Sequence, residues 1–217
     1  MAGYWTGHAV RDERSQDAVA LINQAGDAQL MVLSSQDDRQ FVLFGNVCCA
    51  AAFDDSVAGR RFRDDRNEAA SVQVERNGDS LHGELEFRGD RYVLDLSAAP
   101  EYSQPVTLPQ LAGTYTRSTF AFTTLTLTIE SDGRLTGSDS NGCVMNGSVA
   151  IADQGRNMVR MQVDVANCRN GHGSSQQWNG AYTGLGLLLR ANGNRRDDVF
   201  FHSMIGPTWL GPQSVAR

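Results

Sequence analysis

Residues 124–129 alternate strictly between polar and apolar side chains, in the order Thr-Leu-Thr-Leu-Thr-Ile. A period of two is typical of a β-strand that buries one face, and β-branched residues suit such a surface. Asp132-Gly133 follows, and this pair is a strong hairpin signal because glycine adopts the positive φ that a tight turn needs. The stretch therefore predicts two antiparallel strands joined by a short turn.

A fainter copy of this unit lies near the start of the chain. The opening Gly3-Tyr4-Trp5 is similar to Gly113-Thr114-Tyr115, and Ile22 and Gly26 are spaced like Ile129 and Gly133. Three of the five prolines fall within residues 97–109, which show no apolar periodicity and are typical of a linker. We therefore predict an internal duplication, with domains at 1–98 and 111–217 and a connector at 99–110.

Short strand-like runs separated by turn residues recur along the whole chain, and no segment has a convincing helical period. Each half holds enough such runs for a small closed barrel, and closure removes the exposed strand edges that promote aggregation. The predicted fold class is all-β, as two tandem antiparallel meander or barrel-like domains. One merged sandwich or one larger barrel is the alternative.

Composition excludes several classes of function. All 19 basic residues are arginine, so Schiff-base lysines, a P-loop lysine and a Ser-Lys dyad are absent. The net charge of −6 argues against general binding to nucleic acid or anionic membranes. No apolar run is long enough to cross a bilayer as a helix. We expect neither a metal nor a cofactor, because no two of the four histidines have the spacing of a local metal motif.

Four cysteines bear on the cellular compartment. Cys143 precedes one predicted strand and Cys168 follows the next, and a turn at residues 153–156 would fold these strands into a hairpin. The two thiols then lie on opposite arms, within disulfide range if a bulge corrects the register; two free thiols are the alternative. Adjacent cysteines bond only with strain, so Cys48 and Cys49 are expected to be two buried thiols.

Two groups of proteins resemble parts of this sequence. Gly3-Tyr4-Trp5 and the hairpin at residues 127–137 resemble the calycin group, the avidin-like and lipocalin-like up-and-down barrels. The second half also resembles proteobacterial envelope proteins, often lipoproteins, through residues 111–115, 142–143, 167–168 and 181–185. The resemblance implies a barrel in which the first-strand tryptophan closes one end. It implies no particular ligand.

Reactive groups are few. His172 lies in a glycine-rich loop beside Ser174 and Ser175, but a Ser-His pair would also need an orienting carboxylate and an oxyanion hole, and no nucleophile-elbow motif occurs. We therefore predict no catalytic residue. A hydrolase that uses His172 or His202 is kept as the enzymatic alternative.

Residues 59–66 gather four arginines around one phenylalanine, a combination favoured at protein interfaces. Asp64 and Asp65 lie within the same stretch, so a self-paired surface loop is the alternative. The candidate partner-binding residues are Arg60, Arg61, Phe62, Arg63 and Arg66.

We predict from these features a non-catalytic binding protein of the bacterial envelope. It would recognise a protein partner, as an inhibitor or an immunity protein against a secreted toxin does, because rigid β scaffolds with long loops suit this role. A lipocalin-like carrier of a small apolar ligand is the alternative. The expected location is the periplasm, or the outer membrane as a lipoprotein whose export signal is absent from this sequence; a cytoplasmic location is left open.

Overall fold

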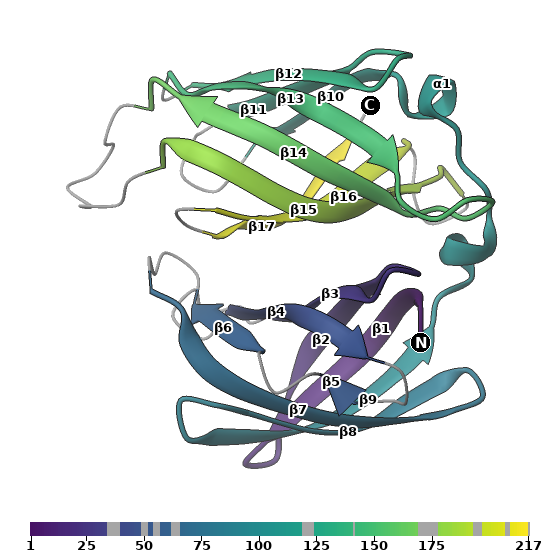
Figure 1. Cartoon of the computed structure of the whole chain (residues 1–217), viewed down its shortest axis with the longest axis vertical. Helices are drawn as coiled ribbons and strands as arrows, with labels where there is room; N and C mark the ends of the chain where they lie inside the picture. Colours follow the sequence, from purple (N-terminus) through teal and green to yellow (C-terminus); the bar gives the residue numbers. More distant parts are fainter. Residues whose placement is uncertain are drawn as a thin grey trace. The chain divides into compact units, whose positions relative to one another are not determined.

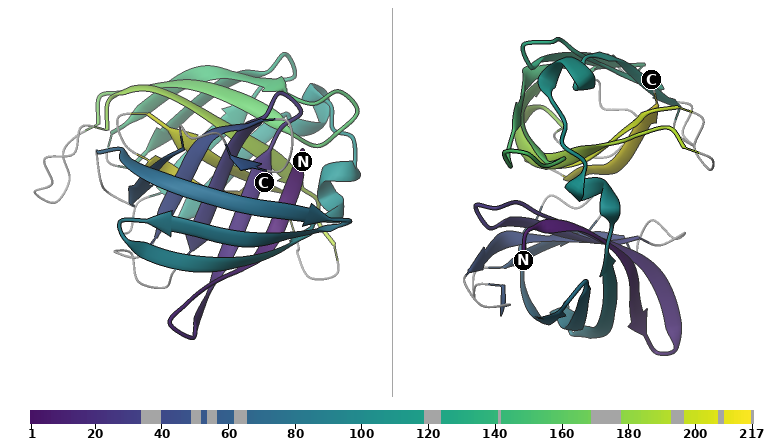
Figure 2. Two further views of the ribbon diagram at one scale, coloured as in Figure 1. Left: turned by 60° about the horizontal axis from the view of Figure 1, so that its bottom comes forward. Right: turned by 90° about the vertical axis from the view of Figure 1, so that its right-hand side faces the viewer.

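The structure, a computed structural model, describes residues 1–33, 40–48, 52–53, 57–61, 66–118, 124–140, 142–168, 178–192, 197–206 and 209–216. The chain divides into two compact units, Met1–Pro100 and Glu101–Arg217. Both are built from antiparallel strands that curve round on themselves (Figure 1; Figure 2). The predicted all-β class with two β domains is confirmed.

The first unit is a nine-stranded, barrel-like sheet. Apart from β5 and β6, consecutive strands pair along the chain, and β9 pairs with β1. The short β5 and β6 share one position, because both pair with β4 on one side and with β7 on the other. The strands are β1 (Gly3–Arg11), β2 (Arg14–Ile22), β3 (Asp27–Leu33), β4 (Phe41–Cys48), β5 (Ala52–Phe53), β6 (Ala58–Arg61), β7 (Glu68–Asn77), β8 (Ser80–Phe87) and β9 (Asp90–Ala98).

The second unit is a closed barrel of eight strands in chain order, in which β17 returns to β10. The alternation predicted for residues 124–129 is confirmed in β11, where every second side chain is buried. The same pattern extends over all eight residues of β14. The strands are β10 (Gly113–Ser118), β11 (Thr124–Ile129), β12 (Arg134–Asp139), β13 (Val144–Ile151), β14 (Val159–Ala166), β15 (Gly180–Leu189), β16 (Val199–Ile205) and β17 (Trp209–Ala216).

Residues 99–110, predicted as a connector, contain regular structure. A 3₁₀ helix spans Pro100–Ser103, and the single-turn helix α1 (Leu108–Leu111) leads into β10. The division between the units falls at Pro100, so most of the segment belongs to the second unit. Tyr102 donates a hydrogen bond to Asp153 of that unit (2.8 Å), which fixes the segment to the β13–β14 turn.

The predicted repeat is visible in the backbone. Gly3 pairs with Ile22 as Gly113 pairs with Ile129, and the glycines of the following turns, Gly26 and Gly133, have φ angles of 92° and 89°. Each of these glycines donates its N–H to the carbonyl three residues earlier. The carbonyl oxygen of each glycine also accepts a 2.7 Å hydrogen bond from the backbone N–H of a valine. This valine is Val47 of β4 in the first unit and Val149 of β13 in the second. The first four strands of the two units thus share register and turn geometry.

The side chains that open the two units are also held alike. Trp5 donates its indole N–H to the carbonyl of Met1 (3.2 Å), and Tyr115 donates its hydroxyl to the carbonyl of Leu111 (2.7 Å). Both rings are buried in the core of their own unit. Tyrosine therefore occupies the place of the tryptophan in the second unit while keeping a hydrogen bond four residues back.

The predicted disulfide is present between Cys143 and Cys168, whose Cα atoms lie 4.0 Å apart. The β13–β14 ladder ends at the pair Val144 and Ala166, so Cys168 lies one residue out of register with Cys143. Asn167, with a φ of 60°, supplies the correction that a bulge was expected to make. The predicted hairpin between β13 and β14 is confirmed.

The shared turn generates a first prediction. A Cβ at Gly133 would lie 2.3 Å from the carbonyl oxygen of Val149, whereas a Cβ at Gly155, also at positive φ (71°), would meet nothing within 4 Å. Gly155→Ala should lower the free energy of unfolding by about 1 kcal/mol for the left-handed backbone. Gly133→Ala should cost about 1–3 kcal/mol more, because the neighbouring strand must move. Urea denaturation measures both, and equal losses would contradict the assignment.

The disulfide generates a second prediction. It joins residues 25 apart in sequence, so its loss should lower the stability of the second unit by about 3 kcal/mol in the chain-entropy description. Replacing both Cys143 and Cys168 by alanine should lower the protection of β13 and β14 amides in hydrogen exchange. Dithiothreitol should reproduce this effect in the wild type and add nothing in the double variant. Unchanged protection in both cases would be inconsistent with a stabilising bridge.

Candidate functional site

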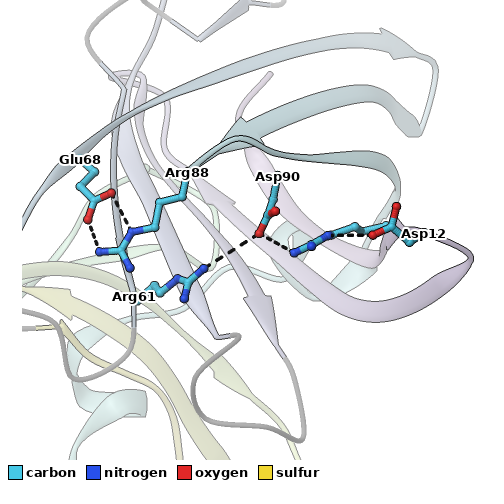
Figure 3. Close-up of polar contacts among 6 residues, drawn as sticks. Asp12, Arg61, Glu68, Arg88 and Asp90 are labelled. Carbon is cyan, nitrogen blue, oxygen red and sulfur yellow. Dashed lines mark hydrogen bonds and ion pairs between the residues drawn. The ribbon is translucent and has the colours of Figure 1, made fainter.

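Charged side chains gather at one end of the first unit's sheet. β1, β6 and β8 end there, and β7 and β9 begin there. Two tight turns at this end, at residues 12–13 and 88–89, carry part of the charge. Three arginines face three carboxylates in this cluster (Figure 3), which we call the arginine rim: Arg11, Arg61, Arg88, Asp12, Glu68 and Asp90.

Buried aromatic rings support two of these arginines. Phe41 packs against Phe87 and Tyr92, with ring centroids 4.9 and 5.3 Å apart, and all three belong to the core of the first unit. The guanidinium carbon of Arg11 lies 5.9 Å from the centre of the Tyr92 ring, and that of Arg88 lies 5.7 Å from the Phe87 ring. These distances suit cation–π contacts, which hold each guanidinium group in place.

Carboxylates fix the same two arginines further. Arg11 donates to Asp12 (3.2 Å) and to Asp90, and Arg88 grips both carboxylate oxygens of Glu68, one of them at 2.7 Å. The pKa of Arg11 is raised above its ordinary value, chiefly by a hydrogen bond to Tyr92 and then by Asp90 and Asp12. Arg11 and Arg88 therefore have defined positions.

Arg61 is held much less firmly. Among the described residues its guanidinium group has one ion pair, a 4.0 Å contact with the Asp90 carboxylate that Arg11 already engages (Figure 3). That distance is too long for a direct hydrogen bond. The Arg61 side chain is 35% exposed and that of Asp90 is 23% exposed, so both can be reached from solvent.

The five predicted partner-binding residues do not form one surface in the described part of the chain. Arg60 is buried and donates from Nε to the Asn67 side chain (2.9 Å), whereas Arg61, the next residue of β6, belongs to the arginine rim. Arg66 is exposed. Phe62 and Arg63 lie outside the described residues.

Sequence reasoning missed the rest of the arginine rim. Arg11, Arg88 and Asp90 are far from residues 59–66 in the chain, and only strand pairing brings them together. The available signal was the position of two turns, Asp12-Glu13 and Arg88-Gly89. In an antiparallel meander, every second turn lies at the same end of the sheet.

Two of the four histidines lie on the outer face of the first unit. His8 and His82 both pair directly with Asp95, and their Nδ1 atoms lie 3.5 Å from Asp17 and 3.3 Å from Asp95 respectively. All four side chains are exposed, as in ordinary surface pairs. Within the described ranges, no three cysteine, histidine or acidic side chains are gathered as metal ligands. His172 lies outside those ranges.

His202 lies in β16 of the second unit and is completely buried. Its ring stacks on Phe200, with centroids 5.3 Å apart, and neither ring nitrogen has hydrogen-bond geometry with a described residue. Burial lowers the pKa of His202 from 6.5 to about 4; the Phe200 backbone offsets this in part, and Arg117 lowers it further. The imidazole is therefore neutral at pH 7.

The chain matches no protein-family model, no curated protein and no solved structure. The barrel-like units are compatible with the calycin group, and membership in that group stays a prediction. Among the described helices, none is long and apolar enough to cross a membrane.

His202 generates a prediction about acid stability. The unfolded chain binds a proton at this histidine near pH 6.5, whereas the folded chain resists protonation until about pH 4. The free energy of unfolding should therefore fall by about 3 kcal/mol as the pH drops through this window. His202→Gln should remove this component of the pH dependence, and His82→Gln, at an exposed site, should not. Identical slopes for wild type and His202→Gln would contradict the prediction.

Proposed function

We propose that this protein is a non-catalytic binding protein that recognises a protein partner through the arginine rim, as an inhibitor or a toxin-immunity protein would. One observation carries the proposal: Arg11 and Arg88 are fixed over buried aromatic rings at one end of the first unit. Arginine and aromatic residues are enriched where proteins bind one another most tightly. A guanidinium group already in position also loses less side-chain entropy on binding.

The backbone of the arginine rim gives independent support. Only four described residues other than glycine have a positive φ, and three of them, Asp12, Glu13 and Arg88, lie in the two turns of this end. That conformation costs free energy for residues with a Cβ, and such costs concentrate at functional sites. The fourth, Asn167, lies beside the disulfide.

The interiors of the two units support a surface site over a carrier role. Large side chains fill the cores, and many of them are fully buried. In the first core they include Trp5, Phe41 and Leu43, and in the second Tyr115, Tyr182 and Phe200. A barrel filled by its own side chains leaves the outer surface and the ends for recognition.

We place this activity outside the cytoplasm, in the periplasm or on an outer-membrane lipoprotein. The Cys143–Cys168 bridge supports an oxidising compartment, because cytoplasmic thiols are kept reduced. A secreted toxin or an envelope enzyme is the kind of partner that such a location offers.

A charge swap tests the proposal. Glu68→Arg combined with Arg88→Glu keeps an ion pair at this place and the net charge, but it exchanges the positions of the positive and the negative group in one pair of the arginine rim. The matched control swaps Glu84 and Arg91, an exposed pair on β8 and β9. In affinity capture from the host envelope fraction, quantified by mass spectrometry, the rim swap should reduce recovery of the partner at least about tenfold, as loss of a hot-spot contact does. The control should leave recovery unchanged.

Two outcomes would overturn this function. In the first, the rim swap and the control capture the same protein equally well. In the second, the wild type yields a tightly held lipid or metabolite and no protein partner. Circular dichroism of each variant separates loss of binding from loss of fold.

A further inference from the structure

The three arginines of the arginine rim differ in how far their hydrogen-bonding capacity is used. Arg11 engages Asp12, Asp90 and Tyr92, and Arg88 holds Glu68 through both oxygens. The Arg61 guanidinium, which has five N–H donors, has only the distant Asp90 beside it among the described side chains. Among the described side chains, Arg61 is therefore the rim arginine whose N–H donors are least used.

We propose that Arg61 binds a side-chain carboxylate from an acidic segment of the protein partner. In the free protein, the Asp90 carboxylate lies beside Arg61 in place of the partner's carboxylate. The proposal rests on the function proposed above and names the chemistry of the partner. On binding, the incoming carboxylate takes the donors of Arg61, and Asp90 remains with Arg11.

The geometry suits this exchange. Because Asp90 contacts Arg11 closely and Arg61 only at 4.0 Å, giving up Arg61 breaks no direct hydrogen bond. A planar guanidinium group binds a carboxylate through two parallel hydrogen bonds, a stronger arrangement than the contact it replaces. The partly exposed Arg61 side chain needs little further desolvation before it can form this pair.

The charges favour a carboxylate over a phosphate group. Asp12, Glu68 and Asp90 balance the three arginines, so the arginine rim carries no net charge among these six residues. A doubly charged phosphate near Arg61 would be repelled by Asp90 and would find one underused guanidinium group. A singly charged carboxylate matches that one group.

Two variants with opposite expected effects test the proposal. The probe is a glutamate-rich hexapeptide titrated into the full chain, and binding is followed by the NMR signal of the Arg61 side-chain Nε–H. Arg61→Gln, followed through nearby backbone amides, should weaken binding about tenfold or more, the usual effect of losing a charged hydrogen-bond partner. Asp90→Asn should strengthen it about threefold to tenfold, because it removes the competing carboxylate. Arg91→Gln, at an exposed pair on the outer face, is the control and should have no effect.

Several results would overturn the proposal. They are no binding of the hexapeptide to the wild type, weaker binding by Asp90→Asn, and tighter binding of inorganic phosphate than of the hexapeptide at Arg61. Failure here is distinguishable from failure of the proposed function. If the rim swap abolishes partner capture while Arg61→Gln captures the partner normally, the arginine rim binds a protein but Arg61 does not bind its carboxylate.

Discussion

Both units depend on backbone pairing between their first and last strands. β1 pairs with β9 over six residue pairs, and β10 meets β17 at Thr116 and Ala216. This pairing satisfies the edge N–H and C=O groups that an open sheet would expose, and it wraps the sheet around its own apolar face. Curvature of this kind brings backbones close together: a Cβ at Gly7, Gly83, Gly147 or Gly184 would lie within about 2 Å of a neighbouring carbonyl oxygen. At these four positions glycine permits the bend.

Wrapping the sheet has a second effect, which concerns the polar residues. With the inner face filled by apolar side chains, charged groups are restricted to the outer face and the strand ends. At one end of the first unit the aromatic residues Phe41, Phe87 and Tyr92 are buried just below the turns. Arginines that leave those turns can therefore cover an aromatic ring and reach a carboxylate together. The arginine rim is in this sense a product of the core beneath it.

The sequence predicted the features whose signals are local. Alternation located β11, Asp132-Gly133 located a turn, and the positions of Cys143 and Cys168 on opposite hairpin arms located the disulfide. The arginine rim is not local, because its arginines come from β1, β6 and the β8–β9 turn. Residues 59–66 have the composition of a surface loop, yet Arg60 and Arg61 lie on β6, where pairing with β4 outweighs the local polarity. Pairing between strands that are far apart in the sequence cannot be predicted from a short local stretch of residues.

The turn that the two units share bears on how the chain is made. In each unit the glycine carbonyl of that turn is tied to a valine in the strand after next, so the early strands close over short sequence separations. Every strand of the first unit precedes Glu101, and its last strand, β9, which pairs with β1, ends at Ala98. During synthesis the first unit can therefore complete its strand pairing before β10 leaves the ribosome. Because the first unit can close before the second unit emerges, the two similar units have little opportunity to exchange strands.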